Sequence, residues 1–96
     1  HITGGGIPGN LPRILPAGTG AVVEEGSWNV PNLFQVLADA GGVERAEMFR
    51  VFNMGVGMIA AVAPERADHL LESLRGAGET AWILGEIEEG EGVRFA

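Results

Sequence analysis

Three consecutive glycines near the start of the chain restrict its fold more than any other feature. They occupy positions 4–6, after the β-branched residues Ile2 and Thr3, and lead into the short apolar stretch 7–15. Glycine is needed where the backbone takes a positive φ or approaches another group without a Cβ, so the pattern predicts a strand, a tight loop and a helix. The N–H groups of such a loop can bind an anion such as phosphate, but a glycine run can equally be an ordinary turn.

Size and charge limit the classes of protein to consider. The 96 residues, 46% of them hydrophobic, suit one globular domain over 1–96. The net charge is −7 and all six basic residues are arginine, which argues against a general nucleic-acid binder. Without lysine there is no GxxxxGK[ST] phosphate loop, so any nucleoside triphosphate chemistry must be completed elsewhere. Without cysteine there are no disulfides or thiolate metal sites, and we predict no metal site in this chain.

The glycine loop begins so early that almost no strand precedes it, and the first residue is His1 instead of methionine. We therefore expect a piece of a longer protein, truncated on its N-terminal side. No apolar run reaches the roughly 20 residues of a membrane span, and no signal-peptide pattern is present. The sequence thus predicts a soluble, cytoplasmic protein.

Hydrophobic periodicity and the positions of glycine and proline predict the remaining elements. The predicted strands cover 21–24, 57–63, 81–88 and 93–96, and the predicted helices cover 32–40, 44–52 and 64–76. The run 57–63 is apolar throughout, as in a central strand buried on both faces. It would form a right-handed crossover with the next helix and strand, and the last two strands would form a hairpin. The predicted fold class is therefore α+β, a mixed, mainly antiparallel sheet with helices packed on it.

Several side chains have both a functional and a structural interpretation. The loops 3–6 and 53–57 are expected to lie close together at one edge of the sheet, where Asn53 could bind substrate or simply take a left-handed conformation. Arg13 and Arg50 could hold phosphate or pair with surface glutamates. The two tryptophans are assigned to packing, the apolar face of helix 32–40 to the core, and the three methionines to core filling.

Three blocks of sequence, in this order and spacing, resemble one enzyme family. They are HITGGGIPGNLPR at 1–13, SWNVP at 27–31 and EMFRVFNMGVGM at 47–58. Together they are similar to the C-terminal part of phosphoribosylformylglycinamidine cyclo-ligases, the aminoimidazole ribonucleotide (AIR) synthetases of purine biosynthesis. The resemblance covers nearly the whole chain.

The resemblance implies an ATP-dependent ligase. In this family an amide oxygen of formylglycinamidine ribonucleotide is phosphorylated and then displaced by a nitrogen of the same substrate, giving AIR, ADP and phosphate. ATP and Mg²⁺ would be bound mainly by the N-terminal half, so this piece alone is expected to be inactive. The implied partners are the ribonucleotide, the protein's own N-terminal domain and a second copy in a homodimer, with no nucleic acid or membrane.

Residue by residue, the resemblance assigns a catalytic role to His1 and substrate or phosphate binding to the two glycine blocks. The binding residues are Thr3, Gly4, Gly5, Gly6, Asn53, Gly55 and Gly57. Gly9 stands where members usually have an acid and Val51 where they usually have threonine, which weakens any role resting on a carboxylate or hydroxyl there. The alternatives are a related ATP-dependent enzyme, such as one like selenophosphate synthetase, or a non-catalytic metabolite-binding module.

Overall fold

The sheet is small and mixed, and its central strand is the first one in the chain. The computed structural model describes residues 1–96. Strand β1 (Thr19–Val23) pairs antiparallel with β2 (Gly85–Glu89) and parallel with β3 (Val93–Phe95), in the order β2-β1-β3. The predicted α+β class with a mixed sheet is confirmed.

The predicted hairpin between the last two strands is wrong, because β1 lies between them. β1 carries the buried side chains of Ala21, Val22 and Val23, so it takes the central position, with a partner on each edge. The turn after β2 runs across the start of β1: the N–H of Gly90 donates to Gly18 O, and Gly92 O accepts from the N–H of Ala21. The glutamate-rich β2 stays at the edge, where polar side chains face water.

The predicted central strand over 57–63 is also wrong. This segment has no partner in the sheet, and no backbone group of residues 58–62 forms a hydrogen bond within the chain. A strand buried on both faces needs neighbours on both sides, and both edges of β1 are already taken. The crossover unit is therefore absent, and Met58, expected in the core, is 65% exposed.

The helices form where periodicity and capping signals predict them. After the glycine loop come α1 (Gly6–Asn10) and a 3₁₀ turn (Leu11–Ile14), and a second 3₁₀ turn (Glu25–Ser27) follows β1. The three later helices are α2 (Asn32–Gly41), α3 (Arg45–Val51) and α4 (Pro64–Gly76). Proline at the first position of α4 and a left-handed Gly42 after α2 set these boundaries, as expected for local signals.

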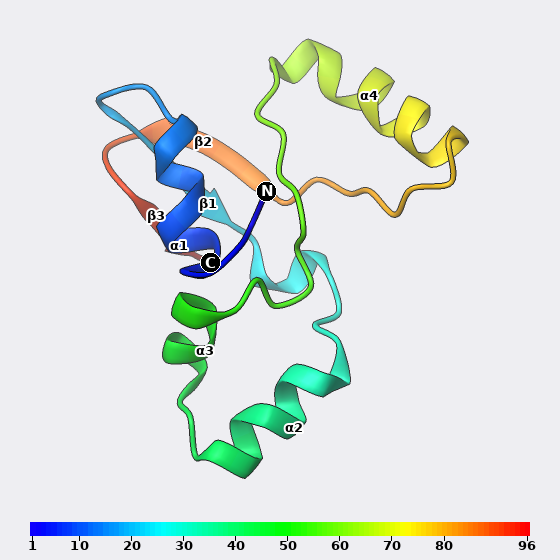
Figure 1. Cartoon of the computed structure of the whole chain (residues 1–96). Helices are drawn as coiled ribbons and strands as arrows, with labels where there is room; N and C mark the ends of the chain where they lie inside the picture. Colours follow the sequence, from blue (N-terminus) through cyan, green and yellow to red (C-terminus); the bar gives the residue numbers. More distant parts are fainter.

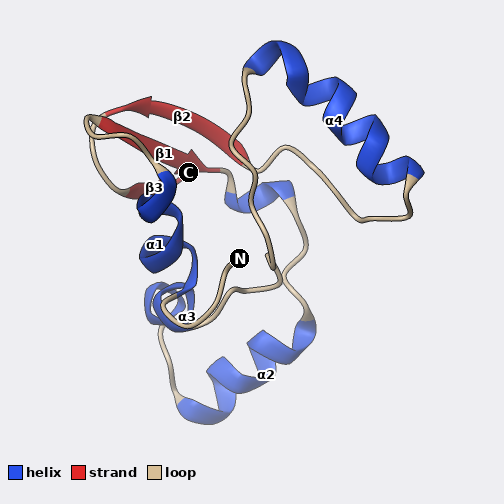
Figure 2. Ribbon diagram, turned by 45° about the horizontal axis from the view of Figure 1, so that its top comes forward, coloured by secondary structure: helices blue, strands red, loops and turns tan.

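Two of these helices contribute no buried residue. Figures 1 and 2 show α3 beside α1, α2 on the side of α3 away from the sheet, and α4 standing apart. The apolar face of α2, predicted to be core, is exposed: Leu33 and Val36 are 62% and 61% accessible. This prediction is wrong for most of the face, because α3 covers only the side of α2 that carries Phe34 and Ala38, which pack on the cluster around Met48 and Phe49.

The core instead joins the opening segment to the sheet. Its first cluster consists of Ile2, Ile7, Leu11, Ala21, Val23 and Val56, and a second cluster consists of Met48, Phe49 and Met54. Trp28 packs against both clusters: its ring stacks on Trp82 at 6.1 Å between centroids, and its Nε1–H donates to Met54 O at 3.0 Å. The assignment of both tryptophans to packing is confirmed, and Trp28 links the two clusters.

Candidate functional site

The glycine loop turns sharply and leads directly into α1. Gly5 has φ +97° and Gly6 has φ +62°, values that residues with a Cβ rarely adopt. The N–H of Gly6 donates to Thr3 O at 3.0 Å, which closes the turn. The predicted loop and helix are confirmed, but residues 1–3 ahead of them form no strand.

Gly6 is also required by a close contact with α3. A Cβ at this position would overlap the carbonyl oxygen of Phe49 and would lie 2.7 Å from that of Phe52. By contrast, a Cβ at Gly4 would have no heavy atom within 4 Å. The three glycines thus differ: Gly6 is needed for packing, Gly5 for its φ angle, and Gly4 for neither.

The loop has backbone donors that the chain leaves free. The N–H groups of Thr3, Gly4 and Gly5 donate to no group of the chain. Unpaired N–H groups on neighbouring peptides attract anions, because each has a positive partial charge and no competing acceptor. Free donors of this kind are what the anion-binding interpretation of the glycine pattern requires, and phosphate binding itself stays a prediction.

The second glycine turn is held by the side chain of Asn53. Its Oδ1 accepts from the N–H of Gly55 at 2.9 Å, an Asx turn that leaves the Nδ2 group without a partner in the chain. The left-handed residues are Met54 at φ 54° and Gly55 at φ 95°, so the suggestion that Asn53 itself takes this conformation is wrong.

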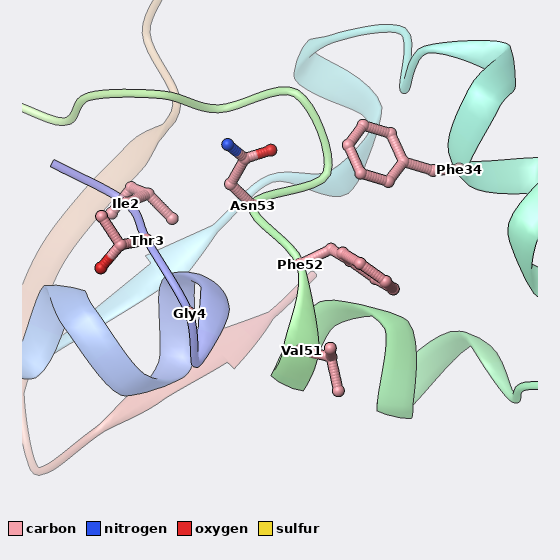
Figure 3. A pocket seen from close by; sticks show the side chains of 7 residues that line it. All are labelled: Ile2, Thr3, Gly4, Phe34, Val51, Phe52 and Asn53. Carbon is pink, nitrogen blue, oxygen red and sulfur yellow. The ribbon is translucent and has the colours of Figure 1, made fainter.

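The two glycine turns meet, as predicted. The N–H of Ile2 donates to Gly57 O at 2.8 Å, and a shallow, open pocket of about 410 Å³ lies beside this contact. Figure 3 shows Asn53 at this pocket, with the opening segment on one side of it and Phe34 on the other. The residues that line the pocket are Ile2, Thr3, Gly4, Phe34, Val51, Phe52 and Asn53.

The predicted site residues divide into two groups. Thr3, Gly4 and Asn53 line the pocket, whereas Gly5, Gly6, Gly55 and Gly57 shape the two turns behind it. His1 is exposed and directly precedes Ile2, the residue that bonds to Gly57. Val51 also lines the pocket. The position where this chain has valine instead of the threonine usual in the resembled family therefore lies at the site.

Sequence reasoning missed Asn10. This side chain is only 8% exposed, and its amide bonds to three carbonyl oxygens of residues 3–6. Asparagine is unfavourable within a helix unless its side chain finds local backbone partners. The sequence did contain a signal for this role: Asn10 is a polar residue within the apolar stretch 7–15, one helical turn after Gly6.

No charged side chain lines the pocket. Arg50 pairs with Glu47 at 3.0 Å, which favours the surface interpretation of that residue, and Arg13 is exposed with no ion pair. The two side chains with a shifted pKa, Glu88 and Arg94, lie on the sheet. The hydrogen bond that Arg94 donates lowers the pKa of Glu88 and raises the pKa of Arg94. The local potential at the pocket therefore comes from backbone and amide dipoles.

Two further findings concern the chain as a whole. Its His, Asp and Glu side chains nowhere gather in a group of three or more that could hold a metal ion. None of its helices combines the length and the apolar character needed to cross a membrane.

Fold and site together define an α+β domain with an open pocket beside two glycine turns and free backbone donors in the first of them. Residues 1–96 match the family described as AIR synthase related protein, C-terminal domain. The chain belongs to this family.

Curated relatives are named phosphoribosylformylglycinamidine cyclo-ligase. The one from Geobacillus kaustophilus (strain HTA426) is 51% identical over 96 residues, which is 100% of this chain and 28% of the relative. The one from Sorangium cellulosum (strain So ce56) is 55% identical over 87 residues, 91% of this chain and 25% of the relative. A chloroplastic/mitochondrial form from Vigna unguiculata is 49% identical over 100% of this chain and 24% of its own length. The chain thus spans about a quarter of the length of these relatives.

Proposed function

We propose that the protein carrying this chain is an ATP-dependent cyclo-ligase that converts formylglycinamidine ribonucleotide to AIR, and that residues 1–96 form part of its C-terminal domain. The family match over the whole chain and relatives about half identical to it support this reaction over a selenophosphate synthetase-like enzyme or a non-catalytic module. A homodimer in the cytoplasm is part of the same proposal.

The observation that carries the proposal is the set of unpaired donors at the pocket. The N–H groups of Gly4 and Gly5 and the Nδ2 group of Asn53 have no acceptor within the chain. A phosphorylated ribonucleotide supplies such acceptors, and hydrogen bonds to a charged oxygen contribute about 1.5–3 kcal/mol each. These donors would orient the substrate, while the bond from the N–H of Ile2 to Gly57 O holds the two turns together and Gly6 packs against α3.

The pocket residues fit a phosphate better than a metal ion. Magnesium prefers carboxylate and phosphate oxygens, and no carboxylate lines the pocket. ATP supplies the phosphoryl group that activates the amide oxygen, and we propose that the Mg²⁺ ligands and most ATP contacts lie in the rest of the longer protein. That part would then be the first partner of this domain.

Isolated residues 1–96 are therefore expected to show no ATP-dependent cyclisation, because they lack magnesium ligands and most of the nucleotide contacts. The measurement is AIR formation from formylglycinamidine ribonucleotide and ATP by the purified 96-residue chain, with the full-length protein as control. Turnover by the isolated chain would contradict this division of the site. An inactive full-length protein would contradict the proposed function itself.

We propose that His1 acts as a neutral hydrogen-bond partner of the reacting group. The free N–H groups of the loop already supply positive potential, and a reacting amidine nitrogen must lose a proton during ring closure. Imidazole gains its charge between about pH 8 and pH 5, so kcat/KM should fall on the acid side.

The test compares the pH dependence of kcat/KM in the full-length wild type and in His1→Asn, which keeps a hydrogen-bonding side chain that does not titrate. The acid limb should disappear in the folded variant. If the limb persists unchanged, His1 is not the titrating group and the role as a base must be abandoned.

A further inference from the structure

We infer that Asn10 is the positioning residue that aims the glycine-loop N–H groups at the pocket. The inference deepens the proposed function and rests on it. Asn10 is the one polar side chain among the buried residues of the chain, and it lies at the end of α1, behind the loop. Burying an amide is unfavourable unless its hydrogen bonds are made, so its partners are informative.

All of these partners belong to the glycine loop. The Nδ2 group donates to Gly6 O at 2.7 Å, to Thr3 O at 3.2 Å and to Gly4 O at 3.3 Å. The Oδ1 atom accepts from the hydroxyl of Thr3 at 3.2 Å. One buried side chain therefore holds carbonyl groups from three of the four residues in the loop.

The orientation of these carbonyls determines the orientation of the N–H groups. Every peptide bond of the chain is trans, so the C=O and N–H of one peptide unit point in opposite directions. The C=O of Thr3 shares its peptide with the N–H of Gly4, and the C=O of Gly4 shares its peptide with the N–H of Gly5. By drawing both carbonyls inward, Asn10 turns both N–H groups outward.

Those two N–H groups are among the donors that the chain leaves free, and Gly4 lines the pocket. Without Asn10, Thr3 O would still accept from the N–H of Gly6, but Gly4 O would lose its only hydrogen bond. The peptide that carries the Gly5 N–H would then be free to rotate, since neither Gly4 nor Gly5 has a Cβ to restrict it. A loop that must be ordered at each binding event binds more weakly than one ordered beforehand. Asn10 thus acts on the substrate through the loop, without touching the substrate.

The test is Asn10→Asp in the full-length protein, a change of nearly equal volume. A carboxylate has no donor and would face three carbonyl oxygens. We therefore expect kcat/KM near neutral pH to fall by roughly 10- to 100-fold, which corresponds to the loss of one or two hydrogen bonds to a charged substrate. Burial and the facing carbonyls raise the pKa of such a carboxyl group, and its protonated form regains one donor. Relative to wild type, the variant should therefore recover activity as pH falls, whereas Asn10→Ala should not.

The matched control is Asn32→Asp, which makes the same exchange at an exposed position in the first turn of α2, outside the pocket lining. Its loss of kcat/KM should be smaller than that of Asn10→Asp. A folded Asn10→Asp protein with kcat/KM within twofold of an active wild type would overturn the role of Asn10 and leave the proposed function standing. Absence of cyclisation by the wild type would overturn the proposed function instead.

A second measurement does not depend on the variants folding. In full-length wild-type protein labelled with ¹⁵N-asparagine, the side-chain amide protons of Asn10 should exchange with solvent at least about tenfold more slowly than those of the exposed Asn29 and Asn32. Equal exchange rates would show that Asn10 does not hold the loop carbonyls, and would overturn the inference.

Discussion

Replacement of Gly6 by alanine should destabilise the domain by about 2–5 kcal/mol. A residue with a Cβ at a left-handed φ costs about 1–2 kcal/mol, and forcing a methyl group into a packed contact costs about 1–3 kcal/mol more. Gly6 has φ +62°, and its Cβ would overlap the Phe49 carbonyl oxygen, which belongs to helix backbone and cannot rotate away. Because domains are stable by only about 5–15 kcal/mol, this loss would be large.

Calorimetric unfolding of the full-length protein measures the effect, as a melting temperature lowered by several degrees in the transition that contains this domain. Gly4→Ala is the matched control, because the same methyl group would meet no atom within 4 Å there. Equal melting temperatures for wild type and Gly6→Ala would contradict the close contact between the glycine loop and α3.

Local signals predicted the helices, and non-local pairing decided the strands. The boundaries of α2 and α4 follow from proline, glycine and apolar spacing, all of which act within a few residues. The run 57–63 has the composition of a buried strand, but composition does not supply the neighbours that such a strand requires. The hairpin prediction failed for a related reason, since the apolar β1, with Ala21, Val22 and Val23 buried, lies between β2 and β3 and pairs with both.

The site was predictable in outline for a different reason. Glycine-rich segments such as 4–6 and 53–57 mark turns and close backbone approaches, because glycine adopts positive φ and has no Cβ. The prediction that these two turns meet is confirmed by the bond between Ile2 and Gly57. Asn10 escaped prediction because its role depends on the direction of loop carbonyls, which no residue type specifies. The functional roles of His1 and the glycines stay predictions, since pocket geometry alone identifies no reaction.

Exposed apolar side chains gather on segments that were predicted to be buried. Leu33 and Val36 on α2, and Met58 and Val62 in the unpaired run, are all at least 41% exposed. The apolar spacing of 32–40 and the continuous apolar run 57–63 are typical of core segments, but the prediction that these side chains are buried is wrong. No element of the chain covers these four side chains, and the chain spans about a quarter of its relatives' length.

The largest effect on catalysis without an effect on folding is expected at Gly4. Its φ is not left-handed, a Cβ there would meet no atom within 4 Å, and it lines the pocket. Gly5 is a poorer probe, because φ +97° would strain any replacement and confuse lost folding with lost binding. In the full-length protein, Gly4→Val should lower kcat/KM by roughly 10- to 100-fold, since its bulk would keep a phosphate from the free N–H groups, at about 1.5–3 kcal/mol per lost bond.

Steady-state kinetics of the full-length wild type, Gly4→Ala and Gly4→Val should give a graded loss, the larger side chain reducing kcat/KM more, while melting temperatures stay equal. Gly76→Ala is the matched control: it also adds a methyl group in open space, but at the end of α4, away from the pocket, and should leave kcat/KM within about twofold of wild type. A folded Gly4→Val protein with wild-type kinetics would mean that no ligand approaches this face of the loop. The backbone donors would then have to be removed from the proposed site, because a phosphate bound to the N–H groups of Gly4 and Gly5 would lie next to the Gly4 side chain.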